Sequence, residues 1–488
     1  MDGKAIKIKH LQEKPAIADI RNIFTHVLEM VLPEQALRRY VKLNQKTNNL
    51  TIANKKYNLN SFERIIVVGG GKAAKRTGAE LVKILDNKIT AGVLNVYQDQ
   101  AREPISERIK LFAADHPTPN EEGLKGARQM LELLKNADSK TMVIALISGG
   151  GSSLMAIPAG KISIEDYQDI SRLLMTVPAT IDEINAVRKH IDLLKGGRMR
   201  RCAAKAGAFI SLVLSDVPVT KTGIVDDTSV ISSGPTVGDD STFEMAKQVL
   251  TGYHIWDAAP PTVKKYIQDN IGKKENETLP KNSPLLSTDK SQYVIIANND
   301  QAMAAAGEKA KELGYTTTLV GWETGKTDDK IKAEVTQEIE NIFRVITPHL
   351  VNTDRITFAS FSTDGIDGHS DLAGALADMD TIQEARQHRM DYKKFAVTYD
   401  SATFFKKLGL EIETGPTGTN VADVSVVLIN NPDNSQRKIA FIFGGEATVN
   451  ISLPDGQKPG NGGRNTHLVL LAAEKLGQLA ECRQQTGI

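Results

Sequence analysis

One segment of the sequence combines a glycine-rich turn with a lysine. In residues 65–74, IIVVGGGKAA, an apolar run is followed by Gly70, Gly71 and Lys72. Glycine lets a backbone approach a ligand closely, and a lysine ammonium is a point charge suited to a phosphoryl group or a carboxylate. The segment therefore predicts an anion-binding turn at a strand end, although a glycine turn with a solvated lysine would give the same pattern.

The same turn also leaves a nicotinamide site open. Gly69, Gly71 and Ala74 fit the G-x-G-x-x-A dinucleotide fingerprint, and Asp99 follows the next apolar run, where an acid could bind a ribose. Lys72 stands inside the turn and favours a phosphoryl or carboxylate ligand instead. An enzyme that uses NADH or NADPH remains the alternative.

A second loop, at the end of the apolar run 142–147, is rich in glycine and hydroxyl groups. Its residues are Ser148, Gly149, Gly150, Gly151, Ser152 and Ser153. Such a loop can present a nest of backbone N–H donors to phosphate oxygens. It is not a P-loop, because the Gly-Lys-Ser/Thr ending is missing, and a dinucleotide site requires no second loop. We expect phosphate binding here, with a plain tight turn as the alternative.

A helix with a capping box follows, and cations gather at its end. Thr180 and Glu183 form the box, and Arg188, Lys195 and Arg198 come later, with two glycines between the last two. Cations near a helix C-terminus complement its dipole, which accounts for Lys195. The glycine-flanked Arg198 is not explained in this way. We therefore take all three cations as candidates for substrate or phosphate binding.

Several carboxylates follow apolar runs and could work on a transferred phosphoryl group. Asp216 ends the run Phe209–Leu214, where it could orient a metal, accept a hydroxyl proton or cap a helix. Asp364, Asp367 and Glu446 supply oxygen atoms suited to Mg²⁺. No spacing rule identifies a metal site from them, so Asp364 and Asp367 are candidate metal ligands only.

Two further glycine-rich segments lie near the end of the sequence. Gly445 and Glu446 follow an apolar run, and Arg464 and Asn465 precede an apolar helix that we expect from about Thr466 to Leu476. Because helix N-termini and glycine turns present N–H groups to anions, these four residues are candidates for the same kind of site.

The elements that must position these residues alternate along the chain. Short Val- and Ile-rich runs are separated by helical patterns: residues 65–68, 93–96, 142–147, 209–214, 294–296, 316–320, 356–361, 424–428 and 439–443. Continuous apolar runs are typical of strands buried on both faces of a mainly parallel sheet. We predict an α/β protein of two domains, divided within the polar stretch 269–292.

Composition excludes several classes of protein. The 60 Lys and Arg residues nearly balance the 59 Asp and Glu residues, so no global field favours nucleic acid or an anionic membrane. Two cysteines are too few for a disulfide framework, which fits a reducing compartment. The sequence shows no signal peptide and no apolar stretch long enough to span a bilayer. We expect a cytoplasmic monomer or homodimer that acts on a small molecule.

Taken together, the motifs resemble the class II glycerate 2-kinases, whose C-terminal half is the MOFRL domain. They are VVGGGKAA, DHPTPNEEGL, LISGGGSSL, IDEINAVRKHIDLLKGGR, LVLSDV, ISSGPTVGDDSTF, STDGIDG, TGPTGTNVAD, FGGEATV and GGRNTHL. The resemblance implies a Rossmann-like, mainly parallel domain over residues 1–285 and a smaller α/β MOFRL-type domain over residues 286–488. It also implies that ATP, with Mg²⁺, phosphorylates the 2-hydroxyl of D-glycerate to give 2-phosphoglycerate and ADP.

The resemblance also implies roles for residues. Lys72 and Arg464 match the catalytic cations of the family, and both could stabilise charge on a migrating phosphoryl group. The loop 148–153 would hold phosphates, Arg198 the glycerate carboxylate, and Asp216 would be a base or metal ligand. Some relatives are called hydroxypyruvate reductases, so an NAD(P)H-dependent hydroxypyruvate reductase is the alternative.

One feature departs from the family. The GGE and GGRN motifs precede TDGIDG and GPTGTN in the family, whereas here they follow them, so the second domain is expected to be circularly permuted. A polar loop at residues 430–436 would make the new connection. We predict that residues 439–476 form a strand and a helix within the second sheet. Arg464 should then face Lys72 across a cleft, with Asp364 and Glu446 on the same side.

Overall fold

The structure is a computed structural model, and its described residues form two compact units. It describes residues 6–8, 14–217, 226–286, 289, 291–320, 334–350, 355–430, 438–447, 449, 451, 453–454 and 457–486. The parallel-sheet unit contains residues 33–216 and 226–296, and the mixed-sheet unit contains the described residues of 1–32, 217–225 and 297–488. The predicted division at residues 285 and 286 stays a prediction.

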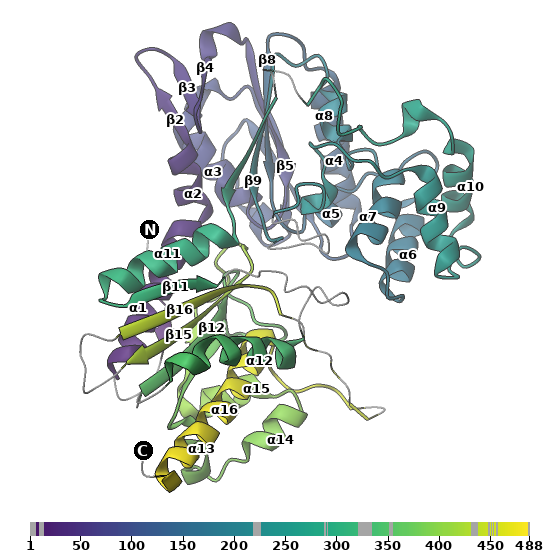
Figure 1. The fold of residues 1–488 in the computed structure, drawn as a ribbon. Coiled ribbons are helices and arrows are strands. Elements are labelled where there is room, and N and C mark those ends of the chain that lie inside the picture. Colours follow the sequence, from purple (N-terminus) through teal and green to yellow (C-terminus); the bar gives the residue numbers. More distant parts are fainter. Residues whose placement is uncertain are drawn as a thin grey trace. The chain divides into compact units, whose positions relative to one another are not determined.

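A six-stranded sheet forms the centre of the parallel-sheet unit, in the order β10-β9-β8-β5-β6-β7. Its strands are β5 (Arg64–Gly70), β6 (Ala91–Tyr97), β7 (Ile109–Ala114), β8 (Thr141–Ile147), β9 (Ala208–Leu214) and β10 (Ser291–Ala297). The pairs β5–β6, β5–β8, β6–β7 and β8–β9 are parallel. Helices α3 (Ala74–Leu85) and α4 (Glu121–Lys135) cover opposite faces (Figure 1). The predicted Rossmann-like sheet is therefore confirmed.

The remaining helices of this unit lie around the sheet and in a helical layer beside it. They are α2 (Pro33–Tyr40), α5 (Gly151–Leu154), α6 (Ile164–Met175), α7 (Ile181–His190), α8 (Arg198–Cys202), α9 (Phe243–Gly252) and α10 (Pro261–Asn270). Helices α6, α7, α9 and α10 share an apolar core of their own. A small antiparallel sheet contains β2 (Val41–Asn44), β3 (Asn49–Ile52) and β4 (Lys55–Asn58).

Local sequence signals fix where two of these helices begin. Helix α4 starts after Asn120, whose side chain accepts a hydrogen bond from the N–H of Gly123 at 2.8 Å. Helix α7 starts with the predicted capping box: Thr180 Oγ1 accepts from the N–H of Glu183 at 3.2 Å, and Glu183 accepts from the N–H of Thr180 at 2.7 Å. Both caps satisfy N–H groups that a helix start leaves without an internal acceptor.

A seven-stranded sheet forms the centre of the mixed-sheet unit, in the order β1-β14-β13-β12-β15-β16-β11. Its strands are β1 (Lys7–Ile8), β11 (Thr316–Val320), β12 (Arg355–Ser362), β13 (Gly374–Asp378), β14 (Glu411–Glu413), β15 (Asp423–Asn430) and β16 (Lys438–Gly445). The apolar runs predicted a mainly parallel sheet, and for this sheet that is wrong. Five of its pairs are antiparallel, and β11–β16 is parallel. The runs of β12, β15 and β16 report burial on both faces, which helices provide here whatever the strand direction.

Helices cover both faces of this second sheet (Figure 1). They are α1 (Pro15–Val31), α11 (Asn299–Glu312), α12 (Val335–Ile346), α13 (Thr381–Gln387), α14 (Tyr392–Val397), α15 (Ser401–Leu408) and α16 (Arg464–Thr486). Helices α1 and α11 lie side by side on one face, and α16 packs on β12 and β13 from the other. The predicted packing of residues 439–476 as strand and helix is thus confirmed for the described residues. Most of the predicted connecting loop, residues 431–437, lies outside them.

Among the helices that the structure describes, none combines the length and the apolar character needed to cross a bilayer.

Candidate functional site

The first candidate centre lies where the strand order of the parallel sheet reverses. From β5 the chain adds β6 and β7 on one side, then returns to place β8 and β9 on the other side. Neighbouring strands β5 and β8 therefore end beside each other. Ligands of open α/β sheets bind beyond the carboxyl ends of strands at such a point. Lys72 follows β5 there, and Ser148 follows β8.

Hydrogen bonds join these two loops. The N–H of Lys72 donates to the carbonyl of Gly149 at 2.9 Å, and the N–H of Ala73 donates to Ser148 Oγ at 3.1 Å. A Cβ atom on Gly71 would lie 2.2 Å from Ser148 Oγ, so only glycine allows this approach. The predicted lysine turn and the predicted hydroxyl loop therefore form one structure.

The joined loops present backbone donors. No described residue accepts a hydrogen bond from the N–H of Gly149 or Gly150. The serine hydroxyls, by contrast, are engaged within the protein: Ser152 meets Ser233 at 2.8 Å, and Ser153 donates to Pro117 O at 2.6 Å. Free N–H groups beside a lysine are suited to phosphate oxygens, so the loop fits the anion-binding role through its backbone. The contacts assign the hydroxyls to holding the loop in place.

Asp216 lies against this loop. A Cβ atom on Gly149 would be 1.8 Å from Asp216 Oδ2, so the carboxylate touches the glycine backbone. Strand β9, which ends at Leu214, brings it there from the neighbouring position in the sheet. The structure thus gathers Lys72, the loop and Asp216 at one place, and their roles stay predictions.

Helix α7 is tied to the same loop and carries one of the predicted cations. Asn185 accepts a hydrogen bond from Ser233 Oγ at 2.9 Å, and Ser233 in turn meets Ser152. Arg188 lies three residues after Asn185, on the same side of the helix. It has no hydrogen bond or ion pair with any described residue. Arg188 is therefore a cation available for an anionic ligand.

Sequence reasoning missed His116, which borders the same loop. A Cβ atom on Gly150 would lie 3.4 Å from the Cδ2 atom of His116 and 3.7 Å from Cγ of Lys72. Burial and the charges of Lys72 and Arg188 lower the pKa of His116. The residue belongs to a motif quoted above, but the strand before it, β7, was not predicted. Recognising that strand would have placed His116 at the same sheet edge.

The other two predicted cations serve the interior of the fold. Lys195 is buried and ion-paired with Asp192, and burial lowers its pKa although Asp192 opposes this. Arg198 donates to three backbone carbonyls, at Lys189, Asp192 and Asn276. These are contacts of structural residues, so a role of Lys195 or Arg198 in substrate binding stays a prediction without a supporting contact.

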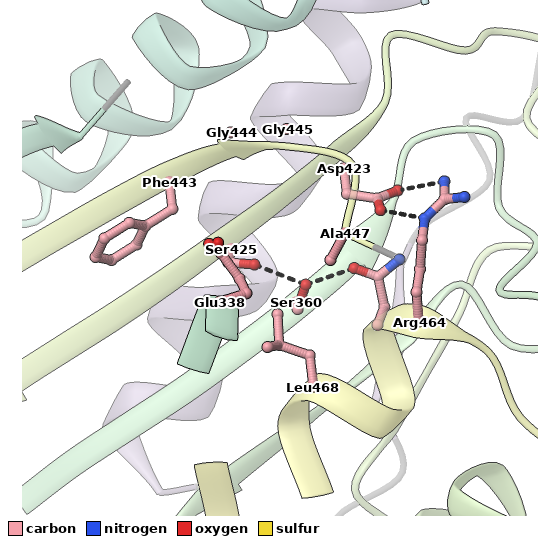
Figure 2. A pocket seen from close by; sticks show the side chains of 11 residues that line it. Glu338, Ser360, Asp423, Ser425, Phe443, Gly444, Gly445, Ala447, Arg464 and Leu468 are labelled. Atoms are coloured by element: carbon pink, nitrogen blue, oxygen red, sulfur yellow. Dashed lines mark hydrogen bonds and ion pairs between the residues drawn. The ribbon is translucent and has the colours of Figure 1, made fainter. Parts of the chain in front are cut away.

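The second candidate centre is a small pocket of about 20 Å³ in the mixed-sheet unit (Figure 2). Strands β12, β15 and β16 and the N-terminus of α16 line it. Arg464 bridges two acids there: it binds both oxygens of Asp423, with Nη2 at 2.9 Å from Oδ1, and its Nη1 donates to Glu446 at 2.7 Å. Gly445 ends β16 beside them. Asp423, which the sequence analysis passed over, is thus the main partner of the predicted cation.

Burial raises the pKa values of two acids in this pocket. It raises the pKa of Asp423 to about 6, against the opposing effect of Arg464. Burial also raises the pKa of Glu338 to about 7; this carboxyl on α12 has no hydrogen bond or ion pair with a described residue. Burial would lower the pKa of Arg464, but Asp423 and Glu446 outweigh it and raise that pKa. At neutral pH the Arg464–Asp423 pair is therefore ionised, whereas Glu338 is poised to lose its proton.

The candidate metal ligands lie in a loop that docks on α16. Asp367 is buried and accepts hydrogen bonds from the N–H groups of Asn465 and Thr466, at 2.9 and 2.7 Å. Asp364 accepts from Ser362 and from the N–H of Ile366, at 2.9 and 3.1 Å. The described residues bring together no group of three acidic, histidine or cysteine side chains that could hold a metal. Magnesium binding by Asp364 and Asp367 stays a prediction.

Known protein families and relatives match most of the chain. The domain of unknown function DUF4147 matches residues 19–268, and the MOFRL family matches residues 336–423. The glycerate 2-kinase of Pyrococcus horikoshii is 31% identical, covering 82% of this chain and 94% of its own length. A protein of Agrobacterium vitis with the provisional name hydroxypyruvate reductase is 31% identical, covering 75% and 99%. The crystal structure of glycerate kinase from Thermotoga maritima matches with a TM-score of 0.70 at 27% identity, covering 86% of this chain and 100% of that one.

Proposed function

The chain belongs to the family that combines the DUF4147 and MOFRL domains and includes glycerate 2-kinases, and from this membership we propose that it phosphorylates D-glycerate. The reaction transfers the γ-phosphoryl group of ATP to the 2-hydroxyl of D-glycerate and gives 2-phosphoglycerate and ADP. A small anionic substrate agrees with the sequence, whose balanced net charge leaves anion binding to local cations.

The observation that carries this proposal is the joined loop pair at the switch point. It combines the ammonium of Lys72 with the N–H groups of Gly149 and Gly150, from which no described residue accepts a hydrogen bond. Phosphoryl transfer needs positioning and fixed positive charge around oxygens that gain charge, more than it needs covalent help from the protein. Lys72 supplies the charge, the two N–H groups supply fixed dipoles, and Arg188 supplies a second cation for a substrate carboxylate or phosphate.

Other parts of the proposal rest on the chemistry of ATP and on composition. Mg²⁺ would accompany ATP and neutralise its phosphates, with Asp216, Asp364 and Asp367 as the candidate ligands. Arg464 of the mixed-sheet unit would act on transition-state charge. We place the enzyme in the cytoplasm, as a monomer or homodimer, on the strength of its two cysteines and its apolar pattern.

The test is a coupled assay for ADP with MgATP and D-glycerate. We expect ADP release that depends on D-glycerate, with phosphorus NMR showing the product as 2-phosphoglycerate. A 3-phosphoglycerate product would refute the regiochemistry. Absence of glycerate-dependent ADP, together with oxidation of NADH or NADPH by hydroxypyruvate, would replace the kinase with the reductase.

A further inference from the structure

His116 reaches the candidate site from the far edge of the parallel sheet. Strand β7 is the last strand of the sheet order, yet its following loop places the imidazole against Gly150, at 3.4 Å from an added Cβ. Ser153 Oγ donates to Pro117 O at 2.6 Å and so ties this loop to the segment after β8. Lys72 borders the same glycine. Three strand ends therefore converge on one point, with the imidazole facing it.

The groups already assigned to this point are nearly all donors. The ammonium of Lys72, the guanidinium of Arg188 and the N–H groups of Gly149 and Gly150 can hold carboxylate or phosphate oxygens, but they cannot accept a hydrogen bond. A hydroxyl substrate also needs an acceptor, since its O–H must point away from the phosphorus that its lone pair attacks. His116 has no hydrogen bond with any described residue, and its partly buried side chain keeps an exposed part that a ligand can reach.

The surroundings keep the imidazole neutral. Lys72 from the turn after β5 and Arg188 from α7 add their charges to the effect of burial, and all three lower the pKa of His116. Tyr97 from β6 meets the ring edge-on, with centroids 6.3 Å apart. The neighbouring acid, Asp115, is held by two side-chain amides instead. A neutral imidazole has one nitrogen free to accept a hydrogen bond and a proton near neutral pH.

We propose that His116 is the acceptor for the substrate hydroxyl that attacks ATP, a role that rests on the proposed kinase function. The hydroxyl oxygen forms a bond to the γ-phosphorus while the bond from that phosphorus to the bridging oxygen breaks. ADP leaves with the electron pair of the broken bond, and the hydroxyl proton passes to the imidazole, which returns it to water. The competing acceptor is Asp216, whose carboxylate lies at Gly149 on the same loop.

Steady-state kinetics of His116→Ala and His116→Gln test this role. We expect His116→Ala to lower kcat about 100-fold and to leave the KM for ATP within threefold. His116→Gln retains an acceptor oxygen but no base. Compared with His116→Ala, it should therefore bring the KM for D-glycerate back to the wild-type value and leave kcat low. As the pH is lowered, the kcat/KM of the wild type should begin to fall only below the pH range in which histidines ordinarily titrate, because the pKa of His116 is lowered. This acidic limb of the pH profile should vanish in both variants. The exposed His388→Gln is the matched control, and melting curves show that each variant is folded.

Two results would overturn the proposal. In the first, the kcat of His116→Ala stays within threefold of the wild-type value. The acidic limb of the pH profile then persists in His116→Ala and disappears only in Asp216→Asn. The other comes from the side-chain NMR signal of His116, assigned by its loss in His116→Gln: D-glycerate with a non-hydrolysable ATP analogue should shift it. An unmoved signal refutes the role of His116 even if the wild type turns over. If the ligands shift the signal but the wild type releases no ADP, the proposed kinase function is refuted instead.

Discussion

The charge of Lys72 should stabilise mainly the transition state in which the phosphoryl group is transferred. Three oxygens of that group carry the developing charge, and a fixed cation stabilises it more than it stabilises bound ATP. We expect Lys72→Met to lower kcat by about two to four orders of magnitude, with a smaller change in the KM for ATP. The ADP assay measures this, and Lys161→Met, at an exposed lysine, is the control. A Lys72→Met enzyme within threefold of wild type would remove Lys72 from the mechanism.

Arg464 combines a structural and a proposed catalytic role, and a double variant separates them. Arg464→Ala leaves Asp423 buried without its cation, so we expect a loss of up to about 3 kcal/mol of stability along with a fall in kcat of about two to four orders of magnitude. Adding Asp423→Asn removes the unpaired charge and should recover much of the melting temperature. Turnover should stay low in the double variant. If turnover returned with stability, Arg464 would be structural only.

The carboxyl of Glu338 should make stability depend on pH. It is 7% exposed, and burial raises its pKa from 4.5 to about 7. Between these values the unfolded chain releases a proton that the folded chain keeps, so stability falls as pH rises through this window. Glu338→Gln cannot ionise, so at pH 8 it should be more stable than the wild type by at most about 3 kcal/mol, and equal to it near pH 4. Urea unfolding at both pH values measures this, and exposed Glu308→Gln should show no such difference.

The start of helix α7 positions two residues of the candidate site, Asn185 and Arg188. Its capping box links Thr180 and Glu183 reciprocally. Thr180→Ala removes one accepted hydrogen bond and should cost about 1 kcal/mol, while Thr180→Ser keeps the hydroxyl and should cost much less. Differential scanning calorimetry compares the two. Equal losses would mean that the threonine methyl group, rather than the cap, stabilises this helix.

Elements with a strong local signal were predictable from the sequence, and those set by distant partners were not. Each predicted apolar run coincides with a strand. For the inner strands the cause is burial on both faces, which leaves a continuous apolar pattern, whereas edge strand β11 is largely exposed. Strand β13 was missed since its sequence, GALAD, has little strand preference. Its place is set by pairing with β12, which approaches so closely that a Cβ on Gly374 would lie 2.0 Å from Ser360 O. Strand direction was mispredicted in the second sheet because the pattern does not encode it.

The candidate site was predictable where the chemistry is local and not where it depends on convergence. Lys72 and Gly149 stand in recognisable turns, and their loops are hydrogen-bonded in the structure. His116 and Asp423 escaped notice, since each acquires its surroundings from segments far away in the sequence. Arg198 looked available because of its neighbouring glycines, whereas the fold directs its donors to backbone carbonyls.

At the scale of the whole molecule, the first helix shows how chain order and spatial grouping differ. Helix α1 packs against α11, and Phe24 meets Phe361 with ring centroids 4.1 Å apart. It therefore joins the mixed-sheet unit, although the sequence analysis grouped it with the residues that follow it. An amphipathic pattern reveals that a helix has an apolar face, but it does not say which core receives that face.

The C-terminal segment should be indispensable to the mixed-sheet unit. Strand β16 lies between β15 and β11, and α16 covers β12 and β13. A chain ending at Asn430 lacks the fully buried Ile442, Val469 and Leu476. It would expose the residues that these side chains cover and would leave β11 without its described neighbour. Each such side chain contributes about 2 kcal/mol, so losing all of them exceeds the usual stability of a domain once the rest of the strand and helix is counted.

We therefore expect a chain ending at Asn430 to be insoluble, or to lose protease resistance throughout the mixed-sheet unit. A chain ending at Ala480 removes only the last turns of α16, where Glu481 and Cys482 are exposed, and should melt within a few degrees of the full chain. Limited proteolysis and thermal unfolding compare the two. If the shorter chain stayed soluble with an unchanged melting temperature, strand β16 and helix α16 would be an appendage, and the idea that a permuted chain completes its own sheet would fail. Survival of the Ala480 chain alone would instead locate the required contacts between Lys438 and Ala480, where the sheet and its covering helix place them.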